Sequence, residues 1–344
     1  MAWKQEKRET GAISSGLVVS RYFTLALWLK AFVTGAILYL VLSRVEFHVA
    51  RAIFLNVQVP FLAAALILLL PMGFTAALRW RSVAAACGER LRFRDALLYG
   101  WIGQFLNLGL PIVGFDGMRA WKLHQQGTPL GLAARIVVFD RLCALASLVF
   151  VTTLGMPRIL TASGDGWFQS AAVVALLVGV SALAFLVLFR NLAPFLPNIP
   201  LFKPLLALSD ELNVVATKGI AAKALSWGVC NHLCRVALVI LLAYSIGTDL
   251  HAYDAFAFVP VALLIAMVPI SLGGWGVREV VFISAFGLVG ITAAQALGLS
   301  VLFGLTGLLA GLLGGVIWMF EQHHLSRALP ERLHEPSNAV AKPL

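Results

Sequence analysis

Runs of about 20 mostly apolar residues recur along this chain, and they constrain its fold more than any other feature. A helix needs roughly 20 such residues to cross the hydrocarbon core of a bilayer. Of the 344 residues, 60% are hydrophobic and only 12% are charged, about half the charged share of a soluble domain. We therefore predict an all-α fold, a polytopic transmembrane helical bundle with about eight spans. These are 25–43, 60–78, 132–154, 168–189, 223–246, 253–270, 279–295 and 297–319.

One further apolar stretch, 97–115, is short and contains several glycines and Pro111. We interpret it as re-entrant, so that it enters the membrane and returns to the side it left. The positive-inside rule supports this interpretation, because lysine and arginine concentrate in cytoplasmic loops. Most of the 26 lysines and arginines then fall on the side of both termini, and the opposite face holds Arg44, Arg51 and Arg158. We expect a multi-pass protein of the cytoplasmic (inner) membrane with both termini in the cytoplasm.

The domain organisation that follows is simple. Residues 1–24 are a polar cytoplasmic arm, 25–320 form the transmembrane domain, and 321–344 are a cytoplasmic tail too short for a core of its own. A basic loop is expected at 79–96. The stretch 253–295 has two interpretations, either two spans or a pair of re-entrant helices.

The segment 267–279, MVPISLGGWGVRE, interrupts two apolar runs. Pro269 removes a backbone donor, and glycine favours non-helical angles, so the helix is expected to break at Gly273, Gly274 and Gly276. Irregular backbone at membrane depth survives where protein or a water-filled cavity satisfies its polar groups. Arg278 and Glu279 follow at the expected start of the next helix, where free N–H groups attract anions. We predict an anion site here, for a lipid phosphate.

A second segment, 107–119, repeats this pattern. Asn107 is followed by Pro111 and two glycines, and then by Asp116 and Arg119. Two broken segments in different parts of a membrane chain indicate a substrate site between them. The alternative is an ordinary loop with a local Asp–Arg pair.

Two predicted spans carry ionisable residues within apolar sequence. Asp140 and Arg141 either form one wall of a charged cavity or make a buried ion pair that fixes helix packing. Asn231, His232 and Arg235 project from one side of a helix, and so predict an inward polar stripe. For His232, a structural hydrogen bond is a better interpretation than catalysis.

These motifs resemble those of the lysylphosphatidylglycerol synthase transmembrane family, also called the flippase-like domain family. The segment 269–279 resembles its signature, 107–119 its second motif and 133–145 its third, with Asp140-Arg141 in place of the usual Glu-Arg. The resemblance covers roughly 25–325. It implies a lipid-handling bundle with re-entrant elements. In two-part relatives a soluble synthase domain follows the bundle; here only the short tail follows, so we expect no aminoacylation of lipids by this chain.

The resulting hypothesis is a protein that binds an anionic phospholipid or lipid-linked intermediate and translocates it across the inner membrane. In it, Arg278, Arg119 and Arg141 supply positive charge, which Asp116, Asp140 and Glu279 balance. The alternative is a membrane enzyme, or the partner of a lipid-modifying enzyme, that transfers a sugar or similar group from a lipid carrier; a third option is a small-solute transporter. No metalloprotease, hydrolase or P-loop motif occurs in the sequence. We expect no catalytic residue, metal, cofactor or nucleic-acid partner.

Overall fold

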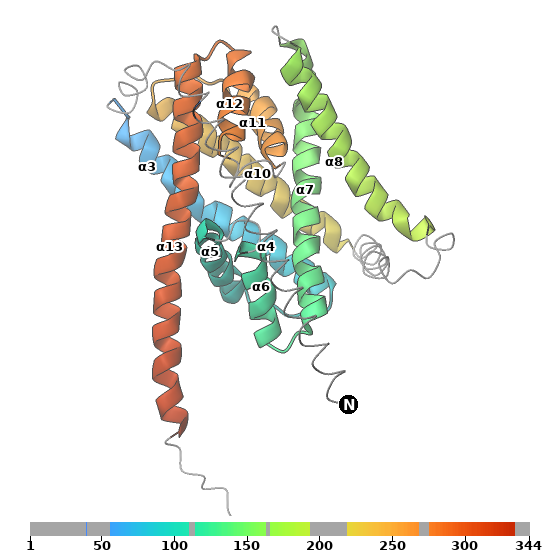
Figure 1. Cartoon of the computed structure of the whole chain (residues 1–344), viewed down its shortest axis with the longest axis vertical. Helices are drawn as coiled ribbons and strands as arrows, with labels where there is room; N and C mark the ends of the chain where they lie inside the picture. Colours follow the sequence, from blue (N-terminus) through green and yellow to red (C-terminus); the bar gives the residue numbers. More distant parts are fainter. Residues whose placement is uncertain are drawn as a thin grey trace, which may run out of the picture. The chain divides into compact units, whose positions relative to one another are not determined.

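A computed structural model describes residues 39, 56–109, 114–162, 166–192, 219–267 and 275–333 (Figure 1). Throughout these ranges the regular secondary structure is helical, which confirms the predicted fold class. Within them, five helices are long and apolar enough to cross a membrane: Val59–Ala86, Leu130–Thr161, Trp167–Leu186, Ala221–Ser245 and Ala293–Glu321. Each coincides with a predicted span. The predicted arm 1–24 and the first predicted span, 25–43, lie outside the described residues but for Tyr39, which is helical.

The helices follow one another in a simple order. In Figure 1 they are α3 (Val59–Ile67), α4 (Leu69–Ala86), α5 (Phe93–Gly109), α6 (Gly114–Gln125), α7 (Leu130–Thr161), α8 (Trp167–Leu192), α10 (Ile220–Ser245), α11 (Ala252–Ala266), α12 (Val277–Gly287) and α13 (Ala293–Leu333). The chain divides into two compact units. The first comprises Met1–Ala65, Leu148–Ser181 and Arg235–Phe303, and the second comprises Leu66–Ser147, Ala182–Cys234 and Gly304–Leu344.

The second unit contains a helical hairpin formed by α5 and α6. Helix α5 ends at Gly109 and α6 begins at Gly114, as the proline and glycines of this segment predict. A side chain at Gly114 would collide with the carbonyl oxygen of Leu106, and one at Gly103 would collide with the ring of Phe115. Glycine at both positions therefore allows the two helices to approach closely.

The core of the second unit packs around Trp80 of α4, together with Leu123, Ile136 and Phe139 of α6 and α7, all almost fully buried. The last helix, α13, packs on α5 through small residues. Side chains at Gly311, Gly314 and Gly315 would collide with Leu108, Trp101 and Phe105. Lys122 of α6 pairs with Glu321 of α13 at 3.0 Å, so α13 holds both helices of the hairpin.

The first unit contains the short pair α11 and α12. At 1.5 Å per residue, their 15 and 11 residues reach about 22 and 16 Å, less than the roughly 30 Å of the hydrocarbon core. Both are shorter than the spans 253–270 and 279–295 that the hydropathy predicts. Helix α11 ends at Ala266 and α12 begins at Val277, so neither helix includes the whole of the apolar run from which its span was predicted.

Aromatic contacts and an ion pair between helix ends contribute to packing among the described residues of the first unit. Phe168 and Phe258 lie with ring centroids 5.9 Å apart, and Phe282 packs against Phe286 at 5.3 Å. Arg158, near the end of α7, pairs with Asp254 in the first turn of α11 at 2.7 Å. By contrast, only 11% of the apolar window of α8 is buried, as expected for a helix that faces lipid.

Helix α13 begins with a reciprocal cap. The hydroxyl of Thr292 accepts a hydrogen bond from the backbone of Gln295, whose side-chain oxygen accepts one from the backbone of Thr292. This capping box satisfies two donors that a helix start leaves without partners. The helix continues to Leu333, so the predicted tail, 321–344, begins as helix, and residues 334–344 lie outside the described ranges.

Candidate functional site

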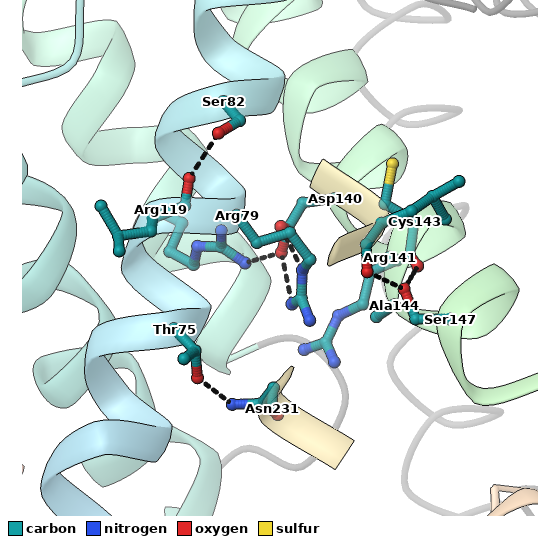
Figure 2. A network of polar contacts seen from close by, with 12 residues as sticks. Thr75, Arg79, Ser82, Arg119, Asp140, Arg141, Cys143, Ala144, Ser147 and Asn231 are labelled. Carbon is teal, nitrogen blue, oxygen red and sulfur yellow. Dashed lines mark hydrogen bonds and ion pairs between the residues drawn. The ribbon is translucent and has the colours of Figure 1, made fainter. Parts of the chain in front are cut away.

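Three charged side chains meet in the interior of the second unit. The carboxylate of Asp140 accepts hydrogen bonds from Nε and Nη2 of Arg79, at 2.8 and 3.1 Å, and from Nη1 of Arg119, at 2.9 Å. Figure 2 shows the two guanidinium groups reaching Asp140 from α4 and α6. All three residues are at least 92% buried. We call Arg79, Asp140 and Arg119 the inner triad.

The position of Arg79 corrects the predicted loop 79–96. Helix α4 does not end with the apolar run but continues through Arg79 to Ala86. Alanine-rich sequence after Ser82 sustains the helix, because alanine has the highest helix propensity. Arg79 and Trp80 thereby turn inward, whereas Arg81 is exposed.

A second ion pair lies beside the inner triad and is more exposed. Nε of Arg141 donates to both carboxylate oxygens of Asp116, at 3.0 and 2.9 Å. The side chain of Arg141 is 50% exposed and that of Asp116 is 29% exposed. Guanidinium carbons of Arg119 and Arg141 lie 5.1 and 4.9 Å from the ring centroid of Phe115. We call Asp116 and Arg141 the outer pair, and the five charged residues together the arginine–aspartate cluster.

The pairing differs from that expected of sequence neighbours. Asp140 pairs with Arg79 and Arg119 and not with the adjacent Arg141, because successive residues on a helix point in different directions. Asp116 and Arg119, the local pair of the alternative interpretation, lie within ion-pair distance at 3.9 Å, but the shorter contact of each crosses to α7. Both ion pairs between α6 and α7 therefore connect the hairpin to a long helix.

Among the described residues, two buried donors in the inner triad region have no hydrogen-bond acceptor. They are Nε of Arg119 and the indole Nε1 of Trp80. The guanidinium of Arg119 stacks over the Trp80 ring, 4.0 Å from its centroid, so the two donors belong to side chains in direct contact. Unmade hydrogen bonds of this kind are costly in a protein interior.

The polar residues of α10 hold neighbouring helices. Nδ2 of Asn231 donates to the backbone oxygen of Met72 at 2.8 Å and to the hydroxyl of Thr75 at 2.9 Å. Figure 2 shows the contact with Thr75. Nε2 of His232 lies 3.1 Å from the backbone oxygen of Ala144. Arg235 is half-buried one turn further along the helix. Asn231 thus binds α10 to α4, and His232 binds it to α7.

The third group of charges lies in the first unit. Helix α12 begins at Val277, so Arg278 and Glu279 occupy its first turn, as the sequence predicts. Nη2 of Arg278 donates to the carboxylate of Glu279 at 2.8 Å, and Nε donates to the hydroxyl of Ser300 at 3.0 Å. That hydroxyl donates in turn to Glu279 at 3.0 Å. The fully buried carboxylate is therefore balanced within its own unit.

Local backbone geometry explains how Glu279 is positioned. Gly276 precedes the helix with a φ of 87°, in the region that favours glycine. Its backbone N–H donates to the other oxygen of Glu279, so the turn and the side chain hold each other. The guanidinium of Arg278 stacks 4.6 Å from the centroid of the Trp275 ring.

The remaining predicted site residues are only partly placed. Asn107 is half-buried in the last turn of α5. Gly273 and Gly274 lie outside the described residues. The second unit contains Asp116, Arg119, Asp140 and Arg141, and the first unit contains Arg278 and Glu279. Among the described residues, no group of histidine, cysteine, aspartate and glutamate could hold a metal ion.

A comparison with models of protein families supplies the identity of the chain. The model of the lysylphosphatidylglycerol synthase transmembrane region matches residues 27–315. The chain belongs to this family. A comparison with curated proteins finds no match.

The structure adds residues that the family motifs in the sequence did not indicate. In this member of the lysylphosphatidylglycerol synthase transmembrane family, Arg79 supplies half of the positive charge of the inner triad, and Trp80 covers Arg119. Ser300 completes the group around Arg278. One sequence signal could have indicated Arg79 and Trp80. The alanine-rich sequence that follows them favours continuation of the apolar helix through both residues. Ser300 had none, because single serines are common in apolar helices.

Proposed function

We propose that this protein binds an anionic phospholipid or lipid-linked intermediate and moves it across the cytoplasmic membrane. The observation that carries the proposal is the arginine–aspartate cluster, in which three arginines face two carboxylates at and below the surface of one unit. Buried charges are costly unless they are paired, and they mark substrate pathways in membrane proteins. The membership of the family is compatible with a lipid-related role in the membrane.

The short helices support a re-entrant arrangement. Helices α5 and α6 have 17 and 12 residues and pack on each other across a break. Helices α11 and α12 repeat the arrangement with 15 and 11 residues. In the proposal each pair enters the membrane and returns to the same side. The ends of these short helices then lie at membrane depth, where helix termini can contact a polar headgroup.

Within the second unit, the outer pair is the first contact for a lipid phosphate. Arg141 is half-exposed and is held by the single carboxylate of Asp116. Its guanidinium has more donors than Asp116 uses, because both hydrogen bonds to Asp116 come from Nε. Arginine also suits a phosphate, since its planar fork matches two oxygens.

Arg278 is proposed as an anion contact of the first unit. It lies in the first turn of α12, where the N-terminal N–H groups favour negative charge. Because Glu279 and Ser300 already use two of its nitrogens, a phosphate at this point would extend the existing network rather than replace it. Asn107 and Arg235 are proposed as further polar contacts. A lipid-modifying enzyme is a proposed partner.

Translocation is tested with fluorescent phospholipids in proteoliposomes. Dithionite quenches label in the outer leaflet, so quenching well beyond half of the signal reports movement between leaflets. We expect excess quenching for the wild type and its loss in Arg141→Gln and in Arg278→Ala. The control is Arg81→Gln, which removes an exposed arginine outside the cluster and is expected to retain activity.

Three results distinguish the explanations. Loss of activity in Arg278→Ala with unchanged thermal stability supports a role of Arg278 in lipid binding, whereas equal loss of both indicates a structural arginine. No excess quenching by well-folded wild type with any anionic lipid argues against translocation. In that event, a product formed from a lipid-linked donor by the purified protein would establish the alternative of group transfer.

A further inference from the structure

The order of helices contains one arrangement twice. A long helical stretch, Val59–Ala86 with 28 residues, is followed by α5 and α6 with 17 and 12 residues and then by α7 with 32. The same order recurs from α10 with 26 residues, through α11 and α12 with 15 and 11, to α13 with 41. In each set the two short helices pack on each other. We call α4–α7 the first set and α10–α13 the second set.

The turns that join these helices also correspond. Helices α4 and α10 are each followed by a glycine with positive φ, Gly88 at 86° and Gly247 at 69°. In both turns the glycine N–H donates to a carbonyl three residues back, and the next N–H donates to one five residues back, which is the Schellman pattern. Gly127 and Gly290 follow α6 and α12 in the same way, at 100° and 82°. Many helices end like this, so the evidence lies in the matching positions of the four turns.

The segments between the short helices share a sequence pattern. Residues 111–119 read PIVGFDGMR and residues 269–278 read PISLGGWGVR, so both contain Pro-Ile followed by Gly-x-x-Gly-x-Arg. Several corresponding positions have one and the same separation along the chain. They are Gly88 and Gly247, Phe93 and Ala252 at the starts of α5 and α11, Gly117 and Gly276, and Arg119 and Arg278. A separation that stays constant from the first turn to the arginine indicates a repeat rather than two unrelated hairpins.

The two arginines have similar surroundings in their own units. Arg119 is 2% exposed and Arg278 is 8% exposed. Each guanidinium lies over the ring of an aromatic residue that precedes it in the chain, 5.1 and 4.6 Å from the centroid. Each also donates to the following long helix, Arg119 to Asp140 of α7 at 2.9 Å and Arg278 to Ser300 of α13 at 3.0 Å. Corresponding arginines therefore make corresponding contacts.

The number of membrane crossings gives the orientation of the two sets. Three candidate spans, Leu130–Thr161, Trp167–Leu186 and Ala221–Ser245, lie between the α4–α5 turn and the α10–α11 turn. The connection 193–218 lies outside the described residues, and its four prolines interrupt any apolar run of roughly 20 residues. An odd number of crossings would place the two turns on opposite sides of the membrane.

The distribution of charge agrees with this orientation. Arg81, Arg90, Arg92 and Arg94, in and beside the α4–α5 turn, are all exposed. In the second set, the turns at 246–251 and 288–292 contain neither lysine nor arginine in their sequence. Because lysine and arginine concentrate on the cytoplasmic side, the turns of the first set are expected in the cytoplasm and those of the second set on the opposite face.

We propose that the first and second sets are two copies of one structural repeat, inserted in the membrane in opposite orientations. The α5–α6 hairpin then enters from the cytoplasmic face, and the α11–α12 hairpin enters from the opposite face. Inverted repeats with helices broken at corresponding positions are the basis of many transporter folds. Each leaflet thereby has a hairpin of its own, as a carrier of lipid between leaflets requires; this last consequence rests on the proposed function.

Labelling of single cysteines from one side tests the orientation. The native cysteines are replaced by alanine in the full-length chain, and one cysteine is then placed at Gln125 or Asp249, exposed residues beside the turns of the first and second sets. A membrane-impermeant maleimide is applied to spheroplasts before and after permeabilisation. We expect Asp249→Cys to react fully in intact spheroplasts and Gln125→Cys to react only after permeabilisation.

Two further positions test whether the short helices form hairpins. Met267, which follows α11, is 54% exposed, and Leu108, near the end of α5, is 38% exposed. If α11 crossed the membrane, Met267→Cys would react from the cytoplasmic side. In the inverted repeat it reacts from the opposite face or is protected from both sides, because the tip of the hairpin lies within the membrane. Leu108→Cys is expected to react from the cytoplasmic side or to be protected.

The results that overturn the inference are distinct from those that test the proposed function. Labelling of Gln125→Cys and Asp249→Cys from the same side, or of Met267→Cys from the cytoplasm, excludes the inverted repeat. Only variants that unfold at the temperature of their cysteine-free parent are compared. Exclusion of the repeat would leave excess quenching in proteoliposomes as support for translocation. A folded protein that moves no lipid would lose the proposed function, while the labelling would still decide the repeat.

Discussion

The inner triad predicts an unusually large effect for one isosteric substitution, Asp140→Asn. The change removes one charge and replaces one carboxylate oxygen by an N–H donor that faces an arginine. Asp140 accepts three charge-assisted hydrogen bonds of 2.8, 3.1 and 2.9 Å and is 1% exposed. After substitution, Arg79 and Arg119 remain buried as like charges with at most one acceptor between them.

The magnitude follows from the loss of a buried partner. A hydrogen bond to a charged group contributes about 1.5–3 kcal/mol, and removing one member of a buried ion pair costs about 3–5 kcal/mol because the other charge stays behind. At least one of the three bonds is lost, since the amide oxygen can occupy the position of Oδ2, which accepts two of them. Because both buried arginines also lose their counter-charge, we expect the free energy of unfolding to fall by about 3–5 kcal/mol. Titration with SDS in mixed micelles, followed by circular dichroism, measures this change.

The matched control is Asp116→Asn, the same chemical change in the outer pair. The side chains of Asp116 and Arg141 are 29% and 50% exposed, and ion pairs exposed to this degree contribute about 0–1 kcal/mol. The expected difference between the two variants is therefore several kcal/mol. If Asp140→Asn destabilises the protein no more than Asp116→Asn does, the inner triad does not hold the helices as described, and the reasoning is refuted.

Three further predictions concern helix packing, and thermal unfolding in detergent measures each. Gly114→Ala should destabilise the α5–α6 hairpin by about 1–3 kcal/mol, because its Cβ meets backbone, whereas Gly100→Ala meets nothing within 4 Å and should be tolerated. Asn231→Leu should lower the free energy of unfolding by about 1–3 kcal/mol, because it removes the amide that donates to the Thr75 hydroxyl and to a backbone oxygen of α4. The control Cys230→Ser changes an exposed neighbour and should be close to neutral. Ser300→Ala should cost about 1–3 kcal/mol, since its hydroxyl bridges the buried ion pair of α12; no loss of stability would contradict that role.

Sequence alone predicts the features of this fold that depend on local chemistry. Apolar runs predict the long helices, and proline with glycine predicts that separate helices, α6 and α12, follow α5 and α11. The position of Arg278 in the first turn of α12 follows from the same rule, because Gly276 can adopt the positive φ that begins the helix. The sequence overestimates the lengths of α11 and α12, because a run of apolar residues does not show at which residue a helix ends.

The partners of the charged residues could not be predicted in this way. Arg79 and Asp140 are 61 positions apart and meet because α4 and α7 pack together. Charge alone placed Arg79 in a loop, since an arginine normally ends an apolar run, but the alanines that follow it keep the helix intact. Likewise, the hydroxyl that contacts Glu279 comes from Ser300 on another helix. Tertiary packing decides these contacts, and one sequence contains little trace of it.

The two ion pairs between α6 and α7 have a mechanical consequence. On α6, Asp116 and Arg119 are almost one turn apart, and they bind Arg141 and Asp140 in opposite polarity. Displacing α6 along its axis by one turn, about 5.4 Å, would bring a side chain opposite one of its own sign. The two ion pairs of opposite polarity therefore fix the register of α6 on α7 and oppose sliding of the hairpin along that helix.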